Sequence, residues 1–346
     1  MTIHERLMQF WAGERPDQIP YTIYYWEWRH VRDDPAWQPM YDDGLGVTFH
    51  LAPYGHEPRN VATESVDTTE GGAQIHREIR RTPIGEISAT WVDGWHRDYW
   101  LKTRQDYRVM TYIVEQTQVV ARLDRLEAEM AALPPFGIPL LALGRTPLQT
   151  ILVDMAGLEA FGAQLFDFES EIRGLYDALL RAFARQVEIV AQAPGRFVSN
   201  LENFTAETLG PRRYREFLLP VYQTYFPALH AAGKIVGSHY DGQTAACRAL
   251  IAESPIDLIE SLTPPPEGDL TLAQARVAWP EKLFWSNLNV ALYQLPPAEL
   301  RRIVLERCEE GAVDGRGLAF EVSEHLPQNW ERSMPVVLDA LKETRS

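Results

Sequence analysis

Short apolar segments alternate with longer amphipathic segments from about residue 137 to the end of the chain. The short segments are apolar on both faces, as expected for strands of a parallel sheet that is covered on both sides. Glycine, proline and polar residues separate them from segments with helical spacing. The predicted strands after residue 130 are 137–143, 196–200, 234–239, 256–261, 282–287 and 317–323.

This alternation predicts an α/β fold, specifically a (β/α)8 TIM barrel. An open doubly wound sheet is the alternative, but no glycine-rich dinucleotide loop follows any predicted strand. We expect a single barrel domain over 1–346. Its first strand is expected in "IPYTIYYWEW".

The segment from about 45 to 115 has a different pattern. Apolar and polar residues alternate in "VTFHLAPYG", in "AQIHREIRRTPIGEISATWV" and in "YRVMTYIV", with turn residues between them. This pattern predicts antiparallel β-hairpins inserted after the first barrel strand. The next segment, "TQVVARLDRLEAEMAALPP", returns to helical spacing.

Composition excludes several classes of protein. The formal net charge is −15, which disfavours nucleic acid as a partner. Cys247 and Cys308 are the only two cysteines, so a disulfide framework and a thiolate zinc finger are excluded. No apolar window is long enough to span a membrane, and the N-terminal segment lacks a signal-peptide core. We expect a cytoplasmic protein.

Polar side chains follow the predicted strands, and in a barrel of this class the active site lies at the carboxyl ends of the strands. "GSHYDG" places His239 and Asp241 after one strand, and Glu260 ends the next. One imidazole and several carboxylates at one mouth predict a divalent-metal site. A hydrogen-bonded His–Asp pair without metal is the alternative. The other polar residues expected at the mouth are Glu202, Asn203, Asn287, Glu321 and Glu324.

The first predicted strand ends in "YYWEWRH". Trp26 and Trp28 would line a pocket for a flat substrate, unless alternate members of the aromatic run pack in the barrel core. Arg29 is the expected partner of an anionic substrate group or an acidic site residue.

The chain resembles the uroporphyrinogen decarboxylase superfamily over nearly its whole length, and especially its methyltransferase-like branch. The segments that carry the resemblance are "YYWEWRH", "LGRTPLQTILVDMAGLE", "GPRRYREFLLPVYQTYFPALHAAGKIVGSHYDG", "DLIESLTPPPEGDL" and "FEVSEHLPQNWER". The resemblance implies a (β/α)8 barrel. The arginine-glycine motif of the decarboxylases is missing, and "WEWRH" stands roughly in its place.

The resemblance also implies a set of metal ligands. In the zinc-dependent methyltransferases of this superfamily the ligands include His-x-Cys, a later Glu and a late Cys. His239 and Glu260 match the His and the Glu, whereas Asp241 stands in place of the first Cys. Glu324 stands near the late Cys, with Glu321 as the alternative.

Replacement of both sulfur ligands by oxygen makes the implied site harder and a stronger Lewis acid, suited to polarising an ether or hydroxyl oxygen. The resemblance therefore implies a corrinoid-dependent methyltransferase with Zn2+ or another divalent metal. It would act on a small methylated or methoxylated donor and a corrinoid carried by a separate protein, and a homodimer is left open. The alternatives are a metal-independent decarboxylase or lyase of a carboxylic acid, with Arg29 holding the carboxylate, and a non-catalytic barrel.

Overall fold

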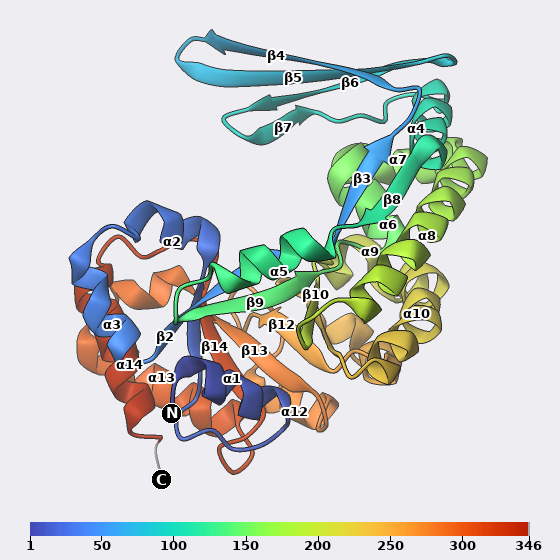
Figure 1. The fold of residues 1–346 in the computed structure, drawn as a ribbon. Coiled ribbons are helices and arrows are strands. Elements are labelled where there is room, and N and C mark those ends of the chain that lie inside the picture. Colours follow the sequence, from blue (N-terminus) through green and yellow to red (C-terminus); the bar gives the residue numbers. More distant parts are fainter. Residues whose placement is uncertain (345–346) are drawn as a thin grey trace. The chain divides into compact units, whose positions relative to one another are not determined.

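The computed structural model describes residues 1–344. It contains a closed barrel of eight parallel strands (Figure 1). Around the barrel the strands follow the order β1, β14, β13, β12, β11, β10, β9, β2. Their bounds are β1 Tyr21–Tyr24, β2 Leu45–Leu51, β9 Gly137–Ala142, β10 Phe197–Asn200, β11 Ile235–His239, β12 Leu258–Leu262, β13 Leu283–Leu288 and β14 Leu318–Val322. The predicted (β/α)8 barrel is confirmed.

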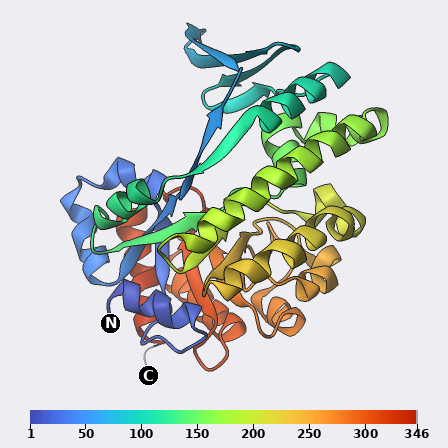
Figure 2. The ribbon, with the colours of Figure 1, turned by 45° about the vertical axis from the view of Figure 1, so that its right-hand side comes forward.

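Helices connect the barrel strands, and those of the C-terminal half run beside the strands in yellow to red in Figure 2. The α-helices of the barrel unit are α1 Ile3–Trp11, α2 Tyr25–Val31, α3 Gln38–Asp42, α5 Leu123–Ala131, α9 Ala206–Arg213, α10 Leu219–Ala231, α11 Arg248–Glu253, α12 Leu272–Ala278, α13 Pro297–Gly311 and α14 Trp330–Lys342. Shorter helical turns are η1 Pro35–Trp37, η3 Tyr214–Leu218, η4 Ala245–Cys247 and η5 Val290–Gln294.

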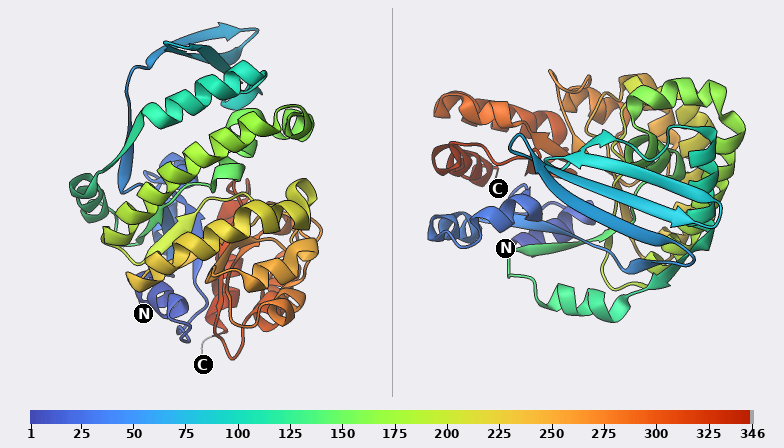
Figure 3. Two further views of the ribbon diagram at one scale, coloured as in Figure 1. Left: turned by 90° about the vertical axis from the view of Figure 1, so that its right-hand side faces the viewer. Right: turned by 90° about the horizontal axis from the view of Figure 1, so that it is seen from above.

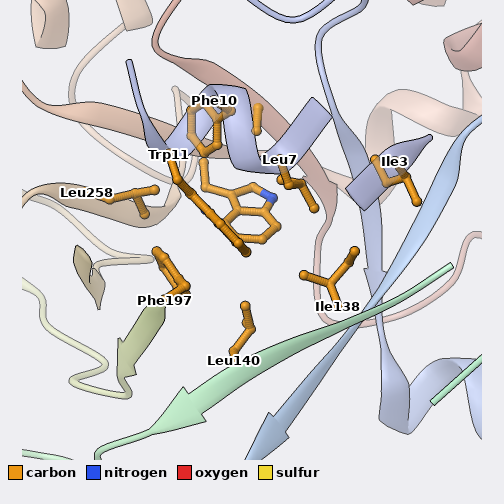
Figure 4. Packing of buried hydrophobic residues seen from close by; sticks show 10 residues of the cluster. Ile3, Leu7, Phe10, Trp11, Ile138, Leu140, Phe197 and Leu258 are labelled. Carbon is orange, nitrogen blue, oxygen red and sulfur yellow. The ribbon is translucent and has the colours of Figure 1, made fainter. Parts of the chain in front are cut away.

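Helix α1 packs its apolar stripe against core residues of the barrel strands (Figure 4). Thr2 and Glu5 form a capping box that starts the helix. Leu7, Phe10 and Trp11 recur at helical spacing and are almost fully buried. The Trp11 ring stacks on Phe197 of β10 with a centroid distance of 4.9 Å. Burial of each such side chain contributes about 1.5–3 kcal/mol.

The chain divides into two compact units, each of which is described by itself. The barrel unit comprises residues 1–53, 123–144 and 190–346, and the second unit comprises residues 54–122 and 145–189. In the second unit β3 pairs with β8, and β4 to β7 form an antiparallel sheet, seen from above in Figure 3. Its elements are β3 Tyr54–Pro58, β4 Ala62–Glu70, β5 Ala73–Thr82, β6 Gly85–Val92, β7 Trp95–Asp98, α4 Arg104–Gln116, β8 Thr117–Ala121, α6 Pro147–Gln149, η2 Thr150–Ala156, α7 Leu158–Asp167 and most of α8 Glu169–Gln192.

The expected boundaries of the hairpin insertion were wrong at both ends. Residues 45–51 form barrel strand β2, so the inserted hairpins follow the second barrel strand and begin at Tyr54. Residues 107–114 belong to helix α4, which a Thr103–Asp106 capping box starts. The alternating pattern misled because the helix also buries Tyr107, Val109, Met110 and Ile113 on one face.

Two further secondary-structure predictions need correction. The first barrel strand ends at Tyr24, and the following residues, Tyr25–Val31, form helix α2. Residues 117–121 form strand β8, since their backbone pairs with β3, and the predicted helix begins only at Leu123.

The carboxyl ends of four neighbouring strands carry the polar residues expected at the mouth. His239 of β11 is in register with Glu260 of β12. Asn287 of β13 is in register with Glu321 of β14. Paired residues of adjacent parallel strands project from the same face, so the barrel brings these four side chains to one end.

Candidate functional site

Three side chains at the carboxyl end of the barrel form a cluster suited to a metal ion. His239, Asp241 and Glu324 each offer one ligand atom, and these atoms all lie within 4.8 Å of one another. His239 is buried, Asp241 is half-buried and Glu324 is exposed. The cluster therefore combines two anchored ligands with one that is open to solvent, and the donors are one nitrogen and two carboxylate oxygens.

The separation between His239 and Asp241 is too long for a hydrogen bond. The Nε2 atom of His239 lies 3.6 Å from Oδ2 of Asp241. Within residues 1–344 neither ring nitrogen of His239 has a hydrogen-bond partner, although both are inaccessible to solvent. A buried nitrogen without a partner is costly, and ligands that share one ion at about 2.1 Å have separations of this order. The geometry fits a divalent cation better than a directly hydrogen-bonded His–Asp pair.

Glu260 faces the other side of the same imidazole. Its Oε2 atom lies 3.6 Å from Nδ1 of His239 and accepts a hydrogen bond of 3.2 Å from the Ser199 hydroxyl. Nε2 of His239 faces Asp241, and Nδ1 faces Glu260. A metal ion bound to Nε2 would therefore lie on the Asp241 side of the ring, and Glu260 would lie on the opposite side. The sequence prediction named Glu260 as a ligand. In this arrangement its carboxylate faces the other ring nitrogen at the same 3.6 Å as Asp241, beyond a hydrogen bond, so it acts on the imidazole through its charge.

The charges of the cluster stabilise one another. Burial lowers the pKa of His239, but the carboxylates of Asp241 and Glu260 outweigh burial and raise this pKa to about 10. Burial raises the pKa of Glu260, and the facing histidines His239 and His50 then bring it well below its usual range. The metal-free protein therefore holds an imidazolium between two carboxylates, and a cation at Nε2 would replace the proton there.

His50 on β2 is a site residue that the sequence analysis missed. Its Nε2 atom lies 3.8 Å from Oε1 of Glu260, and its side chain is only 7% exposed. Strands β2 and β12 are four apart in the closed barrel of eight, so the two side chains meet from opposite walls. An isolated histidine in "TFHLA" does not by itself indicate a functional site. The prediction that this segment forms a hairpin also placed His50 away from the barrel mouth.

Ser261 links several other residues of the barrel mouth. It has a φ of 57° and lies where the pairing of β12 with β13 shifts register. Its hydroxyl donates to Oε1 of Glu321 at 2.8 Å and bonds the Tyr24 hydroxyl at 2.9 Å. Its carbonyl accepts from Nδ2 of Asn287 at 3.4 Å.

The Glu321 carboxyl lies inside the barrel and not in the three-residue cluster. It is 1% exposed, and burial together with the charge of Glu260 raises its pKa to about 8. Of the two residues proposed for the late ligand position, Glu324 is therefore the one that lies beside His239 and Asp241.

The aromatic residues of the first predicted strand have separate roles. Trp26 stacks on Tyr24 at 4.1 Å and on His50 at 5.8 Å between centroids, and its indole donates to the carbonyl of Glu324 at 3.3 Å. Trp28 is half-buried and packs edge-on against Phe49 and Phe136.

Arg29, Glu202 and Asn203 complete the expected set. Arg29 is exposed on α2 and donates to the neighbouring His30. Glu202 is fully buried and accepts from the Tyr222 hydroxyl at 2.8 Å. Asn203 is half-buried and has a φ of 48°, an uncommon backbone state that marks the turn after β10.

Comparisons with known proteins bear on the fold. No protein-family model matches the chain, and no curated protein sequence matches it. Twenty-seven chains of solved structures match. One is a methyltransferase from Methanosarcina mazei, which is 12% identical, with a TM-score of 0.58 and complete coverage of both chains. At this identity the likeness shows a shared fold.

Among residues 1–344, no helix is both long enough and apolar enough to cross a bilayer.

Proposed function

We propose that the protein is a corrinoid-dependent methyltransferase, which moves a methyl group between a small methylated substrate and a corrinoid on a separate protein. The observation that carries the proposal is the cluster of His239, Asp241 and Glu324 at the carboxyl end of the barrel. The full-length likeness to a methyltransferase supports methyl transfer as the class of reaction.

His239, Asp241 and Glu324 would hold a divalent cation, with zinc as the first candidate. Such a cation would supply Lewis acidity toward an oxygen of a methoxylated substrate. The donor set contains one nitrogen, two carboxylates and no sulfur, so it favours activation of an oxygen over activation of a thiol.

The protein's own residues would hold the reacting groups in place. Glu260, 3.6 Å from Nδ1 of His239, would orient the ring through its charge, and the Ser199 hydroxyl donates to Glu260. Trp26 covers His50 and binds the backbone at Glu324, which links the aromatic residues to the metal ligands. This fixed set of contacts would position a small substrate with its methyl group toward an incoming partner.

The test is methyl transfer from a panel of methoxylated compounds to cob(I)alamin, followed by the change in the cobalamin absorption spectrum. We expect transfer with zinc-loaded protein and much slower transfer after chelation. Full turnover of a carboxylic acid to carbon dioxide by metal-free protein would instead favour the decarboxylase alternative.

A further inference from the structure

His50 is a buried polar side chain without a hydrogen-bond partner. Its side chain is 7% exposed, and within residues 1–344 neither of its ring nitrogens donates or accepts a hydrogen bond. Buried polar groups are nearly always paired in folded proteins, and an unpaired group at a site points to a missing ligand. The imidazole ring is held by stacking on Trp26 and by a tilted contact with Tyr24 at 6.1 Å.

A continuous series of contacts connects His50 to the metal cluster on both sides. Glu260 lies between His50 and His239. Trp26 stacks on His50 and donates to the carbonyl of Glu324. His50 on β2 therefore contacts Glu260 and Trp26 beside the metal ligands, three strands from β11 in the barrel order.

The surroundings of His50 determine which of its two ring nitrogens can accept a hydrogen bond. Oε1 of Glu260 lies 3.8 Å from Nε2, so the negative carboxylate favours a hydrogen on Nε2. In the neutral imidazole Nδ1 is then an acceptor.

Asn287 presents a second acceptor. Its Nδ2 atom donates to the Thr263 hydroxyl at 3.0 Å and to the Ser261 carbonyl at 3.4 Å, which assigns the amide orientation. Its Oδ1 atom is buried and has no hydrogen-bond partner within residues 1–344. His50 and Asn287 thus each present a buried acceptor without a partner within residues 1–344, and a ligand would satisfy them by supplying donors.

We propose that His50 and Asn287 bind a hydrogen-bond donor at the non-reacting end of the substrate, so that the methylated substrate also carries a hydroxyl or ammonium group. This inference rests on the proposed function only for the statement that the substrate carries a methyl group to be transferred. Charge supports it, because within residues 1–344 no lysine or arginine forms an ion pair with Asp241, Glu260 or Glu321. A carboxylate at the same end of the substrate would therefore meet mainly acidic groups.

Four small methyl ethers with similar skeletons test the proposal: 2-methoxyethanol, 2-methoxyethylamine, 1-methoxypropane and methoxyacetate. Binding to zinc-loaded protein is measured by ligand-observed NMR, without any corrinoid. We expect at least one of the two donor-bearing ethers to bind about tenfold more tightly than 1-methoxypropane. The choice between hydroxyl and ammonium follows from which of the two binds better.

His50→Phe is the informative variant, because it keeps an aromatic ring against Trp26 and removes both nitrogens. We expect its preference for the donor-bearing ethers to fall to within about twofold, with zinc content unchanged. His4→Phe, on the exposed face of α1, is the matched control and should keep the wild-type preference. If His50→Phe is unstable, His50→Gln replaces it and should keep part of the preference.

Equal binding of all four ethers by the wild type would overturn the proposal, as would an undiminished preference in His50→Phe. A clear preference without any methyl transfer to cob(I)alamin would instead contradict the proposed reaction and leave the recognition by His50 and Asn287 standing.

Discussion

Replacement of Glu260 by glutamine should lower the pKa of His239 sharply. The two groups are separated by 3.6 Å, from Oε2 to Nδ1. At an effective dielectric constant of about 20, this distance corresponds to about 4–5 kcal/mol between unit charges, or about three pKa units. The pKa of His239 is about 10 in the metal-free protein, so the variant should bring it close to the ordinary histidine range.

The assay is an NMR titration of the His239 imidazole in metal-free protein. Glu253→Gln, which changes an exposed acid on α11, is the matched control and should leave the pKa of His239 in place. An unchanged pKa of His239 in Glu260→Gln would show that Asp241 alone stabilises the protonated imidazole, contrary to this prediction. Once the weaker competition from the His239 proton is allowed for, the same variant should bind zinc about 10–100-fold more weakly with unchanged stoichiometry, as expected for loss of a residue that orients a ligand.

Three further predictions follow from the site and the fold. In the wild type, zinc must displace the proton on His239, whose pKa is about 10. Zinc affinity should therefore rise by up to about tenfold for each unit that the pH increases, as long as the pH stays below about 10. Competition with a metal indicator between about pH 6.5 and 8.5 measures this slope, and a flat profile would argue against His239 as a ligand. Asp241→Cys should keep zinc bound and shift methyl-donor preference from oxygen toward sulfur compounds; loss of zinc from this variant would show that the position needs an oxygen ligand. Trp11→Ala should reduce the free energy of unfolding by about 3–5 kcal/mol in urea titrations, because this buried ring stacks on Phe197. The zinc content should not change. A stability loss below about 1 kcal/mol would contradict the packing role of Trp11.

Much of the fold could be predicted because the barrel strands after residue 130 are short, apolar on both faces and separated by helical segments. His239, Glu260, Asn287 and Glu321 could be placed at one end since the carboxyl ends of parallel strands meet there. Local sequence is enough to place such residues at the barrel mouth where the strand boundaries are clear.

The residues that were missed or misplaced depend on tertiary contacts. His50 belongs to a strand whose apolar and polar residues alternate like a hairpin, and only pairing with β1 and β9 makes it a barrel strand. Whether Glu260 binds a metal or orients His239 depends on which ring nitrogen it faces. The bulge at Ser261, which positions Glu321 and Asn287, has no signature in "DLIESL".

The most direct test of His239 as a zinc ligand is the zinc content of purified protein, measured together with melting temperature in the wild type, His239→Ala and the control His4→Ala. We expect about one zinc ion per chain in the wild type and the control. We expect essentially none in His239→Ala, with the fold retained because this residue ends a strand at the barrel mouth. A His239→Ala protein that still holds one zinc ion per chain would show that His239 is not a zinc ligand.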